Sequence, residues 1–199
     1  MHPDITPATW QLWCLALLAL AMLIAVEADT RERRIPNVLV LLMLGAGVTL
    51  NVLGPDNGRA GLFSHFPGAL GLSGAVLGAA IGLLAFLPLY GLRAMGAGDV
   101  KLMAAVGSFV GPMEALNLAL SILVMGGVLA VARMLWSGKS RLVLSNVRLA
   151  LGSLGRGAAP GFDPATQSAD RMPYALAFAS GLALYSYWRL TGGAAFIGY

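Results

Sequence analysis

The sequence contains little charge and few of the side chains that bind metals or form disulfides. Only 11% of its 199 residues are charged, with 13 Lys and Arg against 9 Asp and Glu. A soluble domain has about a quarter of its residues charged, so this chain has too few polar groups to cover a water-exposed surface. Cys14 is the only cysteine, and His2 and His65 are the only histidines. A disulfide framework and a cysteine-rich zinc site are therefore excluded, and we expect neither a metal nor a cofactor.

Hydrophobic residues dominate the remainder of the chain. They make up 58% of it, and the mean hydropathy is +0.77. This excludes disorder, because disordered chains are poor in apolar residues. The isoelectric point of 9.6 is compatible with nucleic-acid binding, but the basic residues are scattered between uncharged blocks, as topology signals are in a membrane protein. We therefore expect a lipid bilayer as a partner and no nucleic acid.

Six uncharged, apolar blocks predict six transmembrane helices. A helix needs about 20 mostly apolar residues to cross a bilayer. The fourth block is shorter than this and on length alone could be re-entrant. The prediction is an all-α fold with a single domain over residues 1–199, a polytopic membrane bundle of six transmembrane helices. The expected spans are 8–28, 36–54, 67–92, 99–112, 115–136 and 172–190.

The distribution of basic residues favours six complete spans. With the N-terminus outside, six spans place both termini outside and most Lys and Arg on the cytoplasmic side, as the positive-inside rule expects. Only Arg59 and Arg189 then remain outside. A re-entrant fourth block would move the basic segment 137–171 outside and remove this bias. A cleavable signal peptide over residues 1–28 is disfavoured, because that segment lacks a basic start.

The longest polar stretch, 137–171, lies between the fifth and sixth expected spans. Leu144, Val147, Leu151 and Leu154 recur in it at helical spacing, with basic residues on another face. This pattern is typical of a short amphipathic helix that lies in a membrane interface. We therefore expect such an interfacial helix between the fifth and sixth spans.

Elimination leaves four acidic residues near the inner membrane boundary. In the expected topology the other acids lie on the outer side or in the cytoplasmic loop. An ionisable group at a membrane boundary is costly and is a functional candidate by default, although it can also mark only where a helix leaves the lipid. The four candidates are Glu27, Asp29, Glu32 and Asp99.

Two of these acids differ from the others in their surroundings. Asp29 opens a charged turn, and Pro36 favours the start of a new helix after it. Asp99 follows Gly96 and Gly98, which permit close backbone approach and unusual dihedral angles just before a helix. The unpaired N–H groups and the dipole at the start of that helix would stabilise an ionised Asp99, whereas Asp29, at a helix C-terminus, should hold its proton more readily. Two such carboxyls can share one proton and hydrolyse a peptide by acid–base catalysis.

Other catalytic schemes fit the sequence less well. Residues 71–74 match the GxSG string of rhomboid serine proteases, but no histidine lies within a spanning block. Ser73 is better interpreted as a small residue in a glycine-rich helix. The spacing of Gly74, Gly78 and Gly82 predicts close packing of that helix against a neighbour. The lack of an HExxH pair disfavours a zinc protease.

Two motifs make the chain resemble the type IV prepilin peptidases, which are membrane aspartic proteases of the GxGD type. The first motif is Asp29 with residues 33–37 (Arg-Arg-Ile-Pro-Asn), and the second is residues 96–101 (Gly-Ala-Gly-Asp-Val-Lys). A weaker third match is residues 171–175 (Arg-Met-Pro-Tyr-Ala), just before the last expected helix. GxGD alone is a weak string. Two aspartate motifs expected at the same membrane boundary are together much more specific.

The resemblance implies a definite activity. Enzymes of this family cut the short basic leader from prepilins or pseudopilins at the cytoplasmic face of the bacterial inner membrane. By resemblance, Asp29 and Asp99 are the catalytic aspartates. The positive charge of the leader also suggests that Glu27 or Glu32 attracts it. The supporting residues of the two motifs are Gly96, Gly98, Lys101, Pro36 and Asn37.

The chain also departs from the larger members of that family. Those carry paired CxxC motifs and often methylate the new N-terminus, whereas this chain has a single cysteine. It resembles the short, peptidase-only branch that serves Flp or tight-adherence pili, so N-methyltransferase activity is not expected. Two other functions stay open. Asp29 and Asp99 could bind cations or relay protons in a small ion-coupled transporter, or the chain could be a non-catalytic assembly subunit of a pilus or secretion machine.

Overall fold

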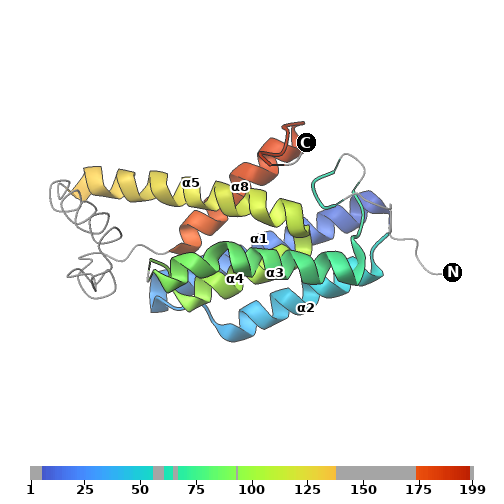
Figure 1. The fold of residues 1–199 in the computed structure, drawn as a ribbon, viewed down its shortest axis with the longest axis horizontal. Helices are drawn as coiled ribbons and strands as arrows, with labels where there is room; N and C mark the ends of the chain where they lie inside the picture. Colours follow the sequence, from blue (N-terminus) through green and yellow to red (C-terminus); the bar gives the residue numbers. More distant parts are fainter. Residues whose placement is uncertain (1–5, 56–60, 65–66, 93, 138–173, 198–199) are drawn as a thin grey trace.

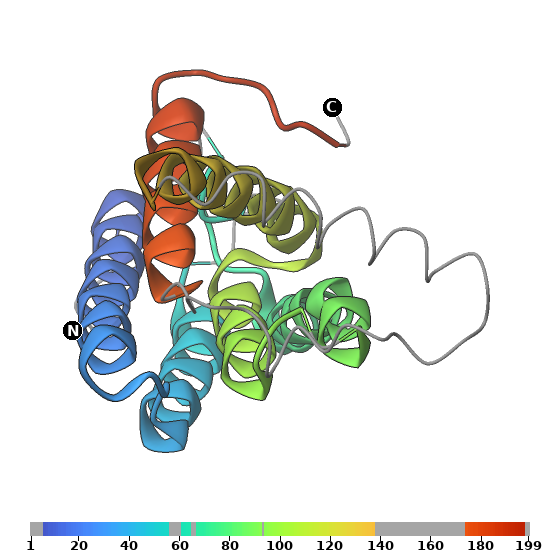
Figure 2. The same ribbon diagram turned by 90° about the vertical axis from the view of Figure 1, so that its left-hand side faces the viewer.

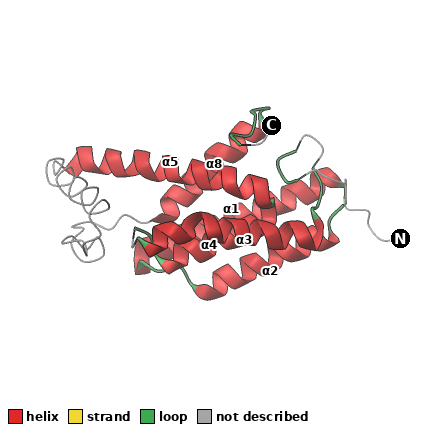
Figure 3. Ribbon diagram, in the orientation of Figure 1, coloured by secondary structure: helices red, strands yellow, loops and turns green. Residues whose placement is uncertain are grey.

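The computed structural model describes residues 6–55, 61–64, 67–92, 94–137 and 174–197, and the elements in these residues are all helices (Figure 3). This confirms the predicted all-α fold for the described part of the chain. The segment 137–171, expected to hold an interfacial helix around Leu144 to Leu154, lies outside the described residues except for its first residue. The helices are α1 (Pro7–Glu32), α2 (Asn37–Leu53), α3 (Gly71–Gly91), α4 (Ala97–Val110), α5 (Pro112–Ser137) and α8 (Tyr174–Leu190).

The helices form one elongated bundle in which successive helices run in opposite directions (Figure 1). α8 is antiparallel to α5, because Ser121 Oγ donates to the Gly181 carbonyl while Glu114 pairs with Arg189. One end of the bundle therefore contains the ends of α1 and α3 and the starts of α2, α4 and α8. We call it the aspartate end, because Asp29 and Asp99 both lie there.

α4 is the most enclosed helix of the bundle. It contacts α2, α3 and α5, and in the end-on view of Figure 2 it lies between α2 and α3. Every residue of α4 from Leu102 to Val110 is buried, and so are Asp99 and Val100. Since α4 is only 14 residues long, its stability comes from these neighbours rather than from its own length.

α3 and α4 approach each other backbone to backbone. A Cβ added to Gly78 would lie 2.2 Å from the carbonyl oxygen of Gly107, and one added to Gly107 would lie 2.2 Å from that of Gly78. A Cβ on Gly82 would lie 2.5 Å from the carbonyl oxygen of Met103. Only glycine fits at these contacts. The predicted close packing of the glycine-rich helix is thus confirmed at Gly78 and Gly82.

A buried amide joins α2 to α4. Asn51 Nδ2 donates to the carbonyl oxygens of Ser108 at 2.8 Å and Phe109 at 3.1 Å. Its Oδ1 accepts from the N–H of Leu70 at 2.9 Å, just before α3. Carbonyls at the end of a helix lack partners within the helix. Asn51 supplies hydrogen bonds to two such carbonyls of α4, and it joins α2 to α4 and to the start of α3.

The turn between α1 and α2 differs from the sequence-based expectation. α1 continues past residue 28 to Glu32, so Asp29 lies within a helix instead of opening the turn. Arg33 ends α1 in the left-handed conformation, with φ 52°, and donates its N–H to the Asp29 carbonyl at 3.1 Å. Pro36, with φ −62°, comes directly before α2, as predicted. The helix extends further because the stop signal is the cap at Arg33, not the first charged residue.

Three of the described helices are long and apolar enough to cross a membrane: α1, α3 and α5 over Pro112–Trp136. α2 is a shorter apolar helix, and α4 and α8 have 14 and 17 residues. The expected six complete spans therefore stay a prediction, as do the positions of the termini. The structure supports a helical membrane protein.

Candidate active site

Asp29 and Asp99 come together at the aspartate end from helices far apart in sequence. Asp29 lies in the last turns of α1 and Asp99 in the first turn of α4. The segments that carry them are in contact, since a Cβ added to Gly98 would lie 3.5 Å from the Cβ of Ile35 in the turn after α1, and the charge of Asp29 contributes to the raised pKa of Asp99. The structure thus juxtaposes the two acids that the sequence singled out.

Asp99 is a buried carboxyl, with 8% of its surface exposed. Its Oδ2 accepts a hydrogen bond from the N–H of Gly96 at 3.1 Å, which caps α4. Burial raises the pKa of Asp99 to about 6; the Gly96 N–H opposes this rise and the charge of Asp29 adds to it. The predicted stabilisation of the ionised form by the helix start is present in the Gly96 N–H, which lowers the pKa of Asp99, but the loss of hydration outweighs it and the net shift is upward.

Asp29 is half-buried and is held by a different helix. Its Oδ2 accepts a hydrogen bond from the main-chain N–H of Ala175 at 3.0 Å. Ala175 is the second residue of α8, so Asp29 contacts a helix N-terminus as well as lying near the C-terminus of its own helix.

Sequence reasoning did not identify this role of α8. The available signal was the weak motif match over 171–175, which marks the start of α8 but does not indicate its hydrogen bond to Asp29. Residues 171–173 lie outside the described part of the chain. Since Ala175 acts through its backbone, no side-chain pattern could have indicated it. The first turn of α8 is a third component of the site.

The two glycines of the second motif act by space rather than by unusual dihedral angles. Gly96 has φ −79° and ψ 154°, which other residues adopt, and Gly98 has no positive φ. A Cβ on Gly96 would lie 3.3 Å from Oδ2 of Asp99, tighter than ordinary contact. A Cβ on Gly98 would lie 3.5 Å from that of Ile35, an ordinary contact. The expectation of unusual dihedrals is therefore wrong.

Lys101 and Asn37 form a contact between the two motifs. Lys101 Nζ donates to Asn37 Oδ1 at 3.2 Å. Asn37 is the first residue of α2, directly after Pro36, and Lys101 lies one half-turn beyond Asp99 on α4. The contact ties the start of α2 to the start of α4 and so supports the position of the Asp99 turn.

Glu27 and Glu32 are both exposed at the aspartate end, but they differ in their geometry. Glu27 Oε1 pairs with Arg31 Nη2 at 3.0 Å. On a helix, residues two apart do not face each other, whereas residues three apart do. Glu27 therefore points away from the Asp29 side of α1, and Glu32 shares that side.

The residues described hold no group of three or more His, Cys, Asp or Glu side chains that could hold a metal ion. Ser73, the residue of the rhomboid-like string, is exposed on α3. The chemical groups gathered at the site are two carboxyls and the backbone donors that hold them. Such a pair can move protons to and from a bound peptide and water.

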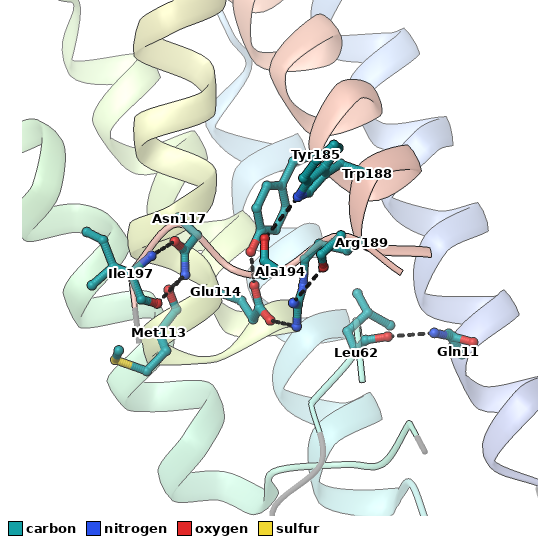
Figure 4. A network of polar contacts seen from close by, with 11 residues as sticks. Gln11, Leu62, Met113, Glu114, Asn117, Tyr185, Trp188, Arg189, Ala194 and Ile197 are labelled. Carbon is teal, nitrogen blue, oxygen red and sulfur yellow. Dashed lines mark hydrogen bonds and ion pairs between the residues drawn. The ribbon is translucent and has the colours of Figure 1, made fainter. Parts of the chain in front are cut away.

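A second polar cluster lies at the opposite end of the bundle (Figure 4). Glu114 of α5 pairs with Arg189 of α8 at 2.9 Å and also accepts a hydrogen bond from the Tyr185 hydroxyl. Asn117 exchanges two hydrogen bonds with the backbone of Ile197. These contacts join the start of α5, the end of α8 and the segment after α8. They lie at the end of the bundle opposite to the aspartate end.

The fold and the site together define a helical membrane protein with paired carboxyls at one end of its bundle. The model of the type IV leader peptidase family matches residues 16–131, a range that contains both aspartates. The chain belongs to this family and is a peptidase of the prepilin type. No curated protein and no solved structure matches the chain.

Proposed function

We propose that the chain is a membrane aspartic endopeptidase that removes the short basic leader from type IV prepilins or pseudopilins. Family membership supports the peptidase activity. The observation that carries the aspartic mechanism is the placement of Asp29 and the buried Asp99 at one end of the bundle, with the pKa of Asp99 raised partly by Asp29. Groups with shifted pKa values are characteristic of catalytic sites.

The proposed chemistry needs one proton shared between the two carboxyls. The ionised carboxylate takes a proton from water as the water oxygen bonds to the carbonyl carbon of the peptide. The protonated carboxyl gives its proton to the carbonyl oxygen, which forms a gem-diol. The C–N bond then breaks, the amine nitrogen takes up the first proton, and a gem-diol hydroxyl returns a proton to the other carboxyl. The products are a carboxylic acid and an amine.

The proposed location is the bacterial inner membrane, with the aspartate end towards the cytoplasm. The excess of basic residues on that side in a six-span topology supports this orientation. The leader, which is basic, would then approach from the cytoplasm. Exposed Glu32 lies on the Asp29 side of α1 and is the better placed of the two glutamates to attract it.

Co-expression with a prepilin that carries a basic leader and an apolar helix tests the proposal. We expect Asp29→Asn and Asp99→Asn each to abolish leader removal while insertion into the membrane persists. Asp56→Asn, an acid between α2 and α3, is the matched control and should leave cleavage intact. Normal processing by either aspartate variant would refute the paired-acid mechanism and favour an assembly subunit or a transporter.

The same substrate tests whether Glu32 or Glu27 attracts the basic leader. Glu32→Gln should raise KM for cleavage at low salt, and added salt should reduce the difference because exposed charges are screened. Glu27→Gln, whose carboxylate pairs with Arg31, is the matched comparison and should have the smaller effect. Unchanged KM in the double variant would exclude both glutamates from leader attraction.

A further inference from the structure

The two carboxyls of the site are held in different ways. Asp99 is capped by Gly96, three residues earlier on the same turn. Asp29 is held by Ala175, which is 146 residues away in the sequence. In both cases Oδ2 is the oxygen that accepts the bond. Among the described residues, these are the hydrogen bonds that reach the two carboxyl groups.

The N–H of Ala175 is available because of its position in α8. The first four N–H groups of a helix have no partner within the helix, and Ala175 is the second residue of α8. Its side chain is fully buried, so little water can replace Asp29 as the acceptor. A hydrogen bond from a backbone amide to a carboxylate is charge-assisted and stronger than one between neutral groups.

α8 presents this amide from a fixed position. In the middle of the helix, Ser121 Oγ donates to the Gly181 carbonyl at 3.0 Å. A Cβ on Gly181 would lie 2.7 Å from the Cα of Ile122, so α8 and α5 are in direct backbone contact there. Arg189 anchors the far end of α8 to Glu114. A donor on such a helix fixes the orientation of the carboxylate that it contacts.

From this geometry we propose that the main-chain N–H of Ala175 is a positioning group that makes Asp29 the general base and leaves Asp99 as the general acid. The inference rests on the proposed function and assigns the two roles within it. Bound through Oδ2, Asp29 keeps Oδ1 to take the proton from water. Asp99, buried at the start of α4, supplies the proton to the carbonyl oxygen.

The sharpest test replaces the N–H of Ala175 by an ester oxygen, through incorporation of lactic acid at position 175. The side chain is unchanged and only the donor is lost. The matched control is the same ester replacement at Leu176, whose N–H also lies in the first turn of α8 and lacks a partner within the helix. Cleavage of a prepilin peptide by the purified full-length enzyme is measured across pH.

We expect the Ala175 ester to lower kcat by about 10- to 100-fold, the range of a hydrogen bond to a charged group, with KM unchanged. The acid limb of the pH–rate profile should move to higher pH, because the carboxylate of Asp29 has lost a donor. The Leu176 ester should change neither kcat nor the profile. Ala175→Pro, which removes the same N–H at a helix position that tolerates proline, should repeat the result.

Three outcomes would overturn the assignment. They are wild-type kcat in the Ala175 ester, an unmoved acid limb, and an equal loss in the Leu176 ester, which would indicate a structural effect. None of these would affect the proposed function, provided that the wild type cuts the peptide and Asp29→Asn does not. Cleavage by Asp29→Asn would instead refute the proposed function itself.

Discussion

Nη2 of Arg189 donates to Oε1 of Glu114 at 2.9 Å, at the end of the bundle opposite to the aspartates. Their side chains are 16% and 15% exposed, and Arg189 Nη1 also donates to the Gly193 carbonyl at 3.1 Å. The Tyr185 hydroxyl bonds the other carboxylate oxygen. This largely buried pair fastens the start of α5 to the end of α8.

Breaking this pair from one side should destabilise the protein. Removing one partner of a fully buried pair costs about 3–5 kcal/mol, so for this partly exposed pair we expect Arg189→Met to cost about 2–3 kcal/mol. Unfolding in lipid nanodiscs measures the loss. The double variant Arg189→Met with Glu114→Leu leaves no unpaired charge and should recover most of the stability. An equal loss in both variants would contradict the assignment of the effect to the unpaired carboxylate.

The rate of leader cleavage should fall as the pH rises through the pKa of Asp99. Burial, with a contribution from the charge of Asp29, raises this pKa to about 6, against the opposing Gly96 N–H. The protonated fraction of Asp99 is complete well below this pKa and falls about tenfold per pH unit above it. If Asp99 is the acid, kcat/KM for a leader peptide should follow that fraction on the alkaline side. A rate that stays constant from pH 6 to about pH 8 would exclude Asp99 as the proton donor.

The two glycines of the second motif should differ in their tolerance of alanine. Neither glycine adopts a positive φ, so the effect of alanine depends only on the room available for its methyl group. Gly96→Ala brings a methyl group to 3.3 Å from Oδ2 of Asp99, whereas Gly98→Ala meets Ile35 at 3.5 Å. We expect Gly96→Ala to lower kcat severalfold and Gly98→Ala to leave it near the wild-type value. A greater loss at Gly98 would indicate that the substrate, rather than Asp99, needs the space.

The backbone contact between α3 and α4 predicts a large stability effect. Gly107→Ala places a methyl group 2.2 Å from the carbonyl oxygen of Gly78, so the helices must separate, at a cost of about 3 kcal/mol or more. Gly127→Ala is the matched control in α5, because nothing lies within 4 Å of its added Cβ. That change should leave the melting temperature unchanged or raise it slightly, since alanine favours helix. Equal melting temperatures for the two variants would contradict the packing at Gly107.

The sequence was sufficient to predict the helical fold and the pair of aspartates. Uncharged apolar blocks mark helices because a membrane excludes charge, and the observed helix bounds lie within a few residues of those expected. Asp29 and Asp99 could be selected because their motifs differ from those of the other acids. Glycine spacing also predicted the close contact at Gly78 and Gly82. All of these are local signals that one segment carries by itself.

The raised pKa of Asp99 and the contact of Asp29 could not be predicted in this way. The N-terminal cap of α4 is visible in the sequence, but the burial that outweighs it depends on the helices that enclose Asp99. The donor to Asp29 is a backbone group on a helix that comes late in the chain. Such contributions arise only from tertiary structure, so local reasoning predicted the stabilising cap of Asp99 but not the burial that outweighs it.

The burial of α4 also determines how a membrane can act on the site. A helix in contact with lipid must match its length to the hydrocarbon thickness or tilt. α4 is covered by α2, α3 and α5 along nearly its whole length, so its 14 residues do not face this constraint. Lipids with longer or shorter acyl chains can therefore affect Asp99 only by shifting the surrounding helices. We expect the position of Asp99 to stay the same in membranes of different thickness, because the outer helices adapt to the change.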